Sequence, residues 1–312
     1  MDSFRNMWFF KNCRIISTVL LHFVVTSISS IYHQSVNKYL RYTTPLIQYP
    51  ILKNKQVIVF VHGRNGWPTD FDPFIDNIKK FCHVLTPEQL LKYGYNSNEI
   101  VIHINKDISE ILSNDPQDEN DKDTSNNPED NKYPLDHIDY PFLEEDLYVI
   151  RKPCLGETGQ TETDEDVDRL VEELKIYENC KIILVALSKG GNVIMRYITR
   201  IKDPRIQKGI TISSPVRGTE IASLFPPTSP VYKSLSYKND LVREVKEKLK
   251  LNNIPIYHIV PKWDFLLIPN KVSYYKTTPE ERIYRYNGWW YGHPGILYCL
   301  DVSKATIRFI KI

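Results

Sequence analysis

The chain of 312 residues lacks the short motifs that mark cofactor and metal enzymes. It has no glycine-rich phosphate loop, no HExxH motif, and no CxxC or Cys/His spacing of the kind that binds zinc. Its five cysteines are odd in number and none is paired with a base at a readable spacing, so we expect free, mostly buried thiols. They are Cys13, Cys82, Cys154, Cys180 and Cys299. The sequence therefore predicts no cofactor and no metal.

The chain also lacks a strong excess of charge of either sign. The net charge is +2, which gives no reason to expect a nucleic-acid partner. The segment Asp115–Asp130 contains seven acids and one lysine, a net charge of −6, so the rest of the chain carries +8. A mildly basic body is compatible with an anionic membrane surface, although an ordinary solvated exterior is favoured. Residues 107–136 have too few apolar side chains to offset the cost of ordering, so we expect a disordered acidic insert.

Residues 1–40 form an N-terminal extension of ambiguous character. Ile15–Ile31 is apolar and follows three basic residues, an order typical of a signal peptide or a single membrane anchor. The run is short for a membrane span, contains His22, and is followed by no clear small-x-small cleavage site. Signal or anchor is favoured over a docked amphipathic helix. The protein is membrane-associated or secreted in the first case and cytoplasmic in the second.

Residues 41–312 read as one domain in which apolar runs of strand length alternate with helical patterns. Helices are expected after Asp70, taken as a cap, and from Thr163, with Asp166 at the spacing of a capping box. Val302–Ile310 closes the chain as a helix or a strand. This alternation predicts an α/β fold with a doubly wound, mostly parallel sheet. The expected strands are Gln56–Val61, Leu147–Ile150, Lys181–Val185, Lys208–Ser213, Ile254–Val260 and Arg282–Tyr286.

The most informative segment is Val185–Gly191, which reads VALSKGG. A serine at the tip of a strand–turn–helix unit stands clear of the backbone at the carboxyl edge of a parallel sheet. The turn is strained, so the positions two before and two after the serine must be small; here they are Ala186 and Gly190. Ser188 is therefore the candidate nucleophile. The alternative is a packing turn in an ordinary βαβ unit.

A serine hydroxyl needs a base, and the base needs an orienting acid. In this architecture the chain order is serine, acid, histidine. Asp264 directly follows an expected strand, whereas the alternatives Asp203 and Asp240 lie in loop or helix contexts. His293 lies in an expected loop flanked by glycines and a proline, and the preceding histidine, His258, sits inside a strand. We therefore predict Asp264 and His293 as the partners of the serine.

Two backbone N–H groups are expected to stabilise an oxyanion. One belongs to Lys189, because any residue after the nucleophile supplies it. The second should come from the loop after the first buried strand, in Val61–Trp67 (VHGRNGW), where Arg64 or Asn65 would point at the oxyanion. His62 ends that strand and is more typical of a structural histidine than of a base.

Taken together, these residues resemble the α/β-hydrolase superfamily, and within it the bacterial lipase and serine esterase branch, with similarity to glycosylphosphatidylinositol-inositol deacylases. The resemblance covers residues 50–312 apart from the acidic insert. It rests on Val59–Gly63, Val185–Gly191, Ser214–Thr219 (SPVRGT) and the loops of Asp264 and His293.

The resemblance implies specific roles for five residues. Ser188 would be the nucleophile, His293 the general base and then acid, and Asp264 the orienting carboxylate. Lys189 and Arg64 would supply the oxyanion N–H groups. Ala186 departs from the glycine that is usual two positions before the serine.

The expected function is hydrolysis of carboxylic esters of lipid or acyl substrates through an acyl-enzyme. Two alternatives stay open: an acyltransferase using the same three residues, and a non-catalytic binding protein on this fold. No long lid is obvious between Arg217 and Ile254, so lipase and simple esterase are both open. Trp289–Tyr291 would pack around the histidine loop or wall an acyl pocket. The sequence does not indicate an oligomeric state.

Overall fold

The computed structural model describes residues 48–104, 142–156, 158–267, 270–287 and 292–312, together with Ser35 and Tyr39. The predictions for the N-terminal extension, for the acidic insert and for Trp289–Tyr291 lie outside the described residues.

The centre of the molecule is an eight-stranded sheet with strand order β10-β9-β8-β7-β2-β5-β4-β3. Neighbouring strands from β10 to β5 are parallel, and β4 is antiparallel to both β5 and β3. A separate pair, β1 (Leu52–Lys53) and β6 (Tyr177–Glu178), is also parallel. The sheet strands are β2 (Gln56–Val61), β3 (His83–Val84), β4 (Val101–His103), β5 (Leu147–Arg151), β7 (Lys181–Leu187), β8 (Ile206–Ile212), β9 (Ile256–Pro261) and β10 (Ile283–Tyr286).

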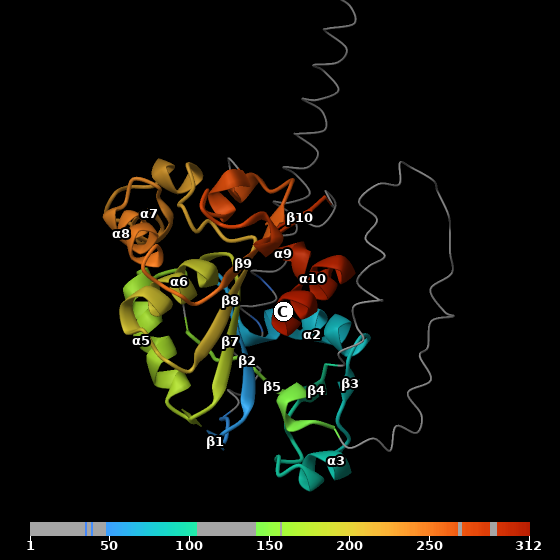
Figure 1. Ribbon diagram of the computed structural model, residues 1–312. Coiled ribbons are helices and arrows are strands. Elements are labelled where there is room, and N and C mark those ends of the chain that lie inside the picture. The colour runs from blue at the N-terminus through green and yellow to red at the C-terminus, as the bar shows by residue number, and fades with distance from the viewer. Residues whose placement is uncertain are drawn as a thin grey trace, which may run out of the picture.

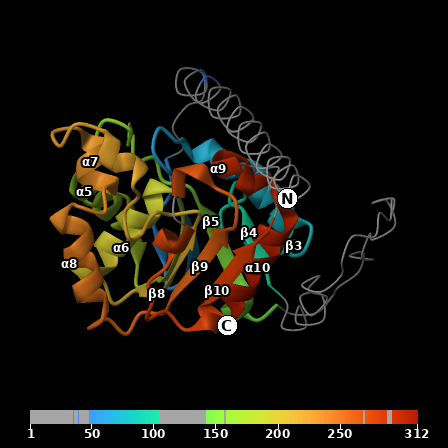
Figure 2. The ribbon, with the colours of Figure 1, turned by 90° about the horizontal axis from the view of Figure 1, so that it is seen from above.

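Helices cover both faces of this sheet (Figures 1 and 2). One face packs against α5, α6 and α8, and the other against α2 and α10. The α-helices are α2 (Asp72–Lys79), α3 (Pro87–Lys92), α5 (Thr163–Leu174), α6 (Lys189–Ile201), α7 (Pro230–Leu235), α8 (Asp240–Leu249), α9 (Gly292–Gly295) and α10 (Leu300–Lys311). Short 3₁₀ turns include η1 (Pro68–Phe71), η2 (Glu144–Asp146), η3 (Ile221–Leu224), η4 (Phe265–Leu267), η5 (Asn270–Ser273), η6 (Glu280–Arg282) and η7 (Ile296–Tyr298).

The continuous apolar runs in the central strands follow from this two-sided burial. Successive side chains of a strand point to opposite faces, so a strand covered on both faces must be apolar throughout. In β7, Ile182, Leu184 and Ala186 belong to the core beneath α5 and α6. Ile183 and Val185 belong to the core beneath α2 and α10. The prediction of a doubly wound, mostly parallel sheet is therefore confirmed.

The structure corrects one predicted helix cap and decides the secondary structure of the C-terminal segment. The prediction that Asp70 caps the following helix is wrong: its Oδ2 accepts a hydrogen bond from the Trp67 backbone N–H at 3.0 Å in η1. The N-cap of α2 is Phe71, which makes no side-chain capping bond. Val302–Ile310, left open between helix and strand, lies in α10.

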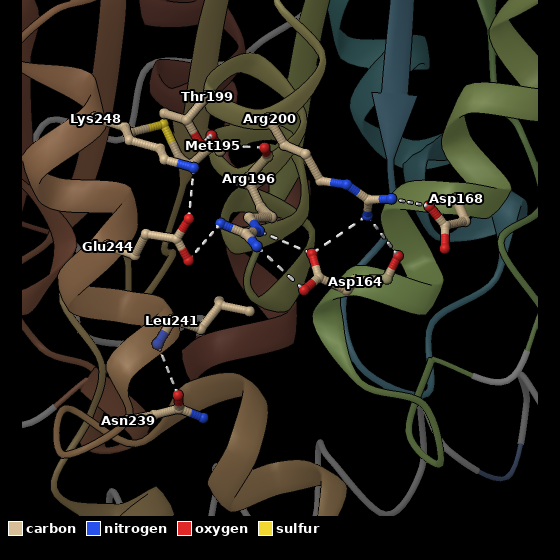
Figure 3. Close-up of polar contacts among 10 residues, drawn as sticks. All are labelled: Asp164, Asp168, Met195, Arg196, Thr199, Arg200, Asn239, Leu241, Glu244 and Lys248. Carbon is tan, nitrogen blue, oxygen red and sulfur yellow. Dashed lines mark hydrogen bonds and ion pairs between the residues drawn. The ribbon is translucent and has the colours of Figure 1, made fainter.

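Helices α5, α6 and α8 are also joined by ion pairs on the side away from the sheet (Figure 3). Arg196 Nε lies 2.8 Å from Asp164 Oδ1, and its Nη1 lies 3.0 Å from Glu244 Oε2. Arg200 Nη2 lies 2.6 Å from Asp168 Oδ1. We call this group the exposed ion-pair cluster, because every member except the buried Arg196 has a side chain at least 35% exposed; its members are Asp164, Asp168, Arg196, Arg200, Glu244 and Lys248.

Candidate active site

Ser188 stands at a strained turn between β7 and α6. Its backbone has φ 53° and ψ −126°, a conformation that residues other than glycine rarely adopt. The turn is tight because α6 starts directly against the end of β2: a Cβ atom at Gly190 would lie 2.4 Å from the carbonyl oxygen of Val61. Only glycine fits there, which accounts for the small residue that the sequence places two positions after the serine.

The structure brings Ser188, His293 and Asp264 together. His293 Nε2 lies 2.6 Å from Ser188 Oγ, and His293 Nδ1 lies 2.5 Å from Asp264 Oδ2. This geometry fits a neutral imidazole whose Nδ1–H donates to the carboxylate and whose Nε2 accepts from the hydroxyl. Asp264 is 4% exposed and His293 is 8% exposed, so water has little access to the pair. The three side chains thus form a continuous line of hydrogen-bond distances from a hydroxyl through an imidazole to a carboxylate.

Asp264 follows β9, and three donors hold its carboxylate. Besides His293, Ser213 Oγ donates to Oδ2 at 2.5 Å, and the Leu266 backbone N–H donates to Oδ1 at 2.9 Å. Burial raises the pKa of Asp264, but His293 and these hydrogen bonds outweigh burial, so the pKa lies below its ordinary value. The carboxylate therefore stays ionised.

Ser213 is a member of the site that sequence reasoning missed. It follows β8, which pairs with β7, the strand before Ser188, and its backbone has φ 48°. Its Oγ lies 3.2 Å from His293 Nδ1 as well as donating to Asp264. The only sequence signal was a polar residue at the carboxyl end of a strand, which by itself does not distinguish a site residue from a loop residue.

The prediction that His293 lies in a loop is wrong in detail. The residue sits in α9, a single turn from Gly292 to Gly295. Glycine and proline usually interrupt helices, so the GHPG sequence favours a loop reading, but four residues need only one turn of helical backbone.

The positions of the predicted oxyanion donors follow from close packing around Ser188. Lys189 is the first residue of α6, whose N-terminus has no side-chain cap, so its N–H is directed out of the helix end. Gly63 packs directly on the serine: a Cβ there would lie 2.9 Å from Ser188 Cβ and 3.5 Å from Ser188 Oγ. Arg64, which follows Gly63, lines the same pocket as the serine.

The side chain of Lys189 carries a second feature that sequence reasoning missed. It is 2% exposed, and its Nζ lies 2.7 Å from Oδ2 of Asp166, which is fully buried. The prediction that Asp166 belongs to a capping box is therefore wrong; Glu162 occupies the N-cap of α5 without a side-chain bond. Burial raises the pKa of Asp166 and lowers that of Lys189, so each charge depends on the other.

His62 and His258 are hydrogen-bonded to groups other than Ser188. The Leu155 backbone N–H donates to His62 Nε2 at 3.1 Å, so the proton sits on Nδ1, which lies 3.1 Å from the carbonyl oxygen of Gly63. His258 is buried in β9 beside Thr211, and burial lowers its pKa to about 3. Both rings are held as structural groups.

A cavity of about 530 Å³ opens beside Ser188 and His293. The polar part of its lining includes Arg64, Asn65 and Thr69. The apolar part comes largely from η3, α7 and η4. Its main members are Leu187, Ala222, Phe225, Val231, Leu235 and Leu267.

The segment between Arg217 and Ile254 thus supplies part of the apolar lining of the pocket. Among the described residues, no group of three or more histidine, cysteine or acidic side chains could hold a metal ion. In the same part of the chain, no helix is both long and apolar enough to cross a bilayer.

These features define the fold class. A mostly parallel sheet is covered by helices on both faces, and a strained serine elbow joins β7 to α6. An aspartate and a histidine follow later strands in the chain order serine, acid, histidine. This combination is the α/β-hydrolase fold.

No family model and no curated protein sequence matches the chain. Among solved structures, it is similar to one of the metagenome-derived lipolytic enzymes LipS and LipT, at 12% identity and a TM-score of 0.44, over 84% of this chain and 96% of the other. An extracellular α/β-hydrolase from a Paenibacillus species matches at 12% identity and 0.44, over 82% and 98%. A bromoperoxidase from Bacillus anthracis matches at 12% identity and 0.46, over 84% and 94%.

Proposed function

We propose that this protein is a serine hydrolase that cleaves carboxylic esters through an acyl-enzyme. The observation that carries the proposal is the unbroken line of hydrogen-bond distances from Ser188 Oγ through His293 to Asp264, at the edge of a pocket large enough for a substrate. A line of this kind activates a hydroxyl that is otherwise a poor nucleophile at neutral pH.

In the proposed reaction, Ser188 Oγ attacks the ester carbonyl carbon while His293 Nε2 takes the hydroxyl proton. The carbonyl oxygen becomes an oxyanion that accepts hydrogen bonds from the backbone N–H groups of Lys189 and Arg64. Collapse of this intermediate breaks the ester C–O bond, and His293 protonates the leaving alcohol. Water, deprotonated by His293, then releases the acid and restores the serine. Asp264 stays ionised and stabilises the imidazolium in both steps.

The lining of the pocket supports an acyl or lipid substrate. The lining residues from η3, α7 and η4 are apolar, which suits an acyl chain. Three of the lining side chains are also well exposed: Phe225 at 41%, Leu266 at 41% and Tyr298 at 47%. Exposed apolar side chains in the lining of a pocket favour a substrate presented at a lipid surface, so we include such a surface among the proposed partners.

The first test compares wild-type protein with Ser188→Ala on aryl esters of increasing acyl length. We expect turnover to fall by about 10⁴-fold or more, because the nucleophile is lost while the fold is kept. A fluorophosphonate probe should label the wild type and not the variant. Activity retained in pure Ser188→Ala protein would rule out this mechanism.

The same assay separates the alternatives. Transfer of the acyl group to an added alcohol in preference to water would identify an acyltransferase. A folded wild-type protein that neither turns over an ester nor reacts with the probe would favour a binding protein.

A further inference from the structure

Three donors converge on the carbonyl oxygen of Gly63, the residue before the proposed oxyanion donor Arg64. Thr158 Oγ1 donates at 2.7 Å, the Gly66 backbone N–H donates at 3.1 Å, and His62 Nδ1 lies at 3.1 Å. In a trans peptide the C=O and the N–H are coplanar and point in opposite directions. The bonds that hold the Gly63 carbonyl therefore also set the direction of the Arg64 N–H.

Thr158 is in turn held by the side chain of Lys189. The Lys189 ammonium donates to the carbonyl oxygens of Thr158 at 2.6 Å and Thr161 at 2.7 Å, and pairs with Asp166. Thr161 Oγ1 donates to Asp166 Oδ1 at 2.6 Å, so the loop and α5 are tied to the same cation. An unbroken series of contacts thus runs from the first residue of α6 to the Gly63 carbonyl.

Stability alone does not account for a buried ion pair at this place. Two charges lose their hydration on burial, and well-packed apolar residues of similar volume often stabilise a protein as well or better. What apolar residues cannot do is donate directed hydrogen bonds to the carbonyls of a loop. The contacts of Lys189 are of this directed kind.

We propose that Lys189, Asp166 and Thr158 form a positioning device that aims the Arg64 N–H at the oxyanion. Lys189 then acts twice: its backbone supplies one donor of the oxyanion hole, and its side chain orients the other. This inference rests on the proposed function, since an oxyanion forms only if the site performs acyl chemistry.

The central test is Thr158→Val, which keeps the shape of the side chain and removes only the hydroxyl. We expect kcat to fall about 10- to 100-fold, a part of the ~10²–10³ that an oxyanion donor contributes. KM should change less than about twofold, because the interaction strengthens only in the transition state. Thr158→Ser keeps the hydroxyl and should restore most of kcat.

A second readout separates positioning from a general structural role. An alkylboronic acid forms a tetrahedral, anionic adduct on the serine, so its affinity reports on the oxyanion hole. In Thr158→Val this affinity should fall by the same factor as kcat/KM, while the thermal unfolding midpoint stays near that of the wild type.

Lys189→Met tests the buried cation, with Arg151→Met as the matched control. The Arg151 Nη2 lies 2.7 Å from Glu99 Oε1, and both side chains are buried, at 1% and 4% exposure, but neither lines the pocket. We expect Lys189→Met to lower kcat and boronate affinity together. Arg151→Met should lower the unfolding midpoint and leave both of those values unchanged in the folded protein.

The outcomes are distinguishable. If folded Thr158→Val keeps the kcat and the boronate affinity of the wild type, the inference is overturned while the proposed function stands. If Lys189→Met fails to fold, the result for Thr158→Val alone decides whether the inference holds. Equal loss of kcat in Arg151→Met and Lys189→Met also overturns it. Wild-type protein that hydrolyses no ester and resists the fluorophosphonate rejects the proposed function, and this inference with it.

Discussion

Helices α5 and α6 are joined by ion pairs at two places, and the two places differ chiefly in their access to water. Near the start of α6, Lys189 meets Asp166 at 2% and 0% exposure. Further along, Arg200 meets Asp168 at 35% and 62% exposure, as part of the exposed ion-pair cluster (Figure 3). The distances are similar, at 2.7 and 2.6 Å.

The difference shows that distance alone does not set what an ion pair contributes. In water, an ion pair gains little, because hydration and salt compete with it. Away from water, neither charge is tolerated without the other. Lys189 of the buried pair directly follows Ser188, so the ion pair with the higher desolvation cost lies at the candidate active site. The exposed cluster lies on the side of the helices away from the sheet.

The largest difference in kcat is expected between variants of a carboxylate inside the candidate active site and of one outside it. Asp264→Asn should lower kcat by about 10⁴-fold, because an amide no longer holds the His293 tautomer or stabilises the imidazolium. Asp168→Asn, in the exposed cluster, should leave kcat unchanged. Steady-state kinetics on one aryl ester measures both. Near-normal turnover in Asp264→Asn would show that catalysis does not depend on the contacts from Ser188 through His293 to Asp264.

A smaller effect is expected on stability, from two aspartates that lie two residues apart on α5. Asp166→Asn should lower the free energy of unfolding by about 3–5 kcal/mol, because it leaves the Lys189 cation buried without a counter-charge. Asp168→Asn should cost less than about 1 kcal/mol. Urea unfolding measures both, and Asp166→Asn combined with Lys189→Met should recover part of the loss. If Asp166→Asn and Asp168→Asn lost equal free energy of unfolding, the buried and the exposed ion pairs would not differ as described.

The smallest effect is expected from Glu244→Gln in the exposed cluster. Hydrogen bonds from Lys248 and Arg196 hold the pKa of Glu244 below its ordinary value of 4.5. A lowered carboxyl pKa stabilises the folded state above pH 4.5, and this contribution is lost as the pH falls through the folded-state pKa. Wild type and variant should therefore differ by less than about 1 kcal/mol at neutral pH and converge in acid or in high salt. A difference that persists in acid would contradict this account.

Much of the fold follows from short stretches of sequence. The run Gln56–Val61 is apolar throughout because both of its faces are covered, and it forms β2 over those residues. The small residue at Gly190 likewise marks a tight turn that the structure contains. The prediction fails where a side chain is taken by another partner. Asp70 accepts from Trp67 in η1, and Asp166 pairs with Lys189, so neither caps the helix expected of it.

The residues of the candidate site also fall into two groups, those with a local sequence pattern and those without one. Ser188 stands in a local pattern that a sequence displays, and the order of Asp264 and His293 along the chain is also visible. Ser213 and the side chain of Lys189 carry no such pattern, because what they contact lies 51 and 23 residues away in the chain.

The amino-acid sequence by itself determined the strand–elbow–helix unit and the two-sided sheet, because periodicity, glycine and strained turns act between residues that are close along the chain. Tertiary structure alone decided which carboxylate meets Lys189, which hydroxyl supports Asp264, and how the Gly63 carbonyl is held. Those contacts depend on how strands align and helices pack. Shifts of an ångström or two decide whether a hydrogen bond forms, and no local pattern encodes distances that finely.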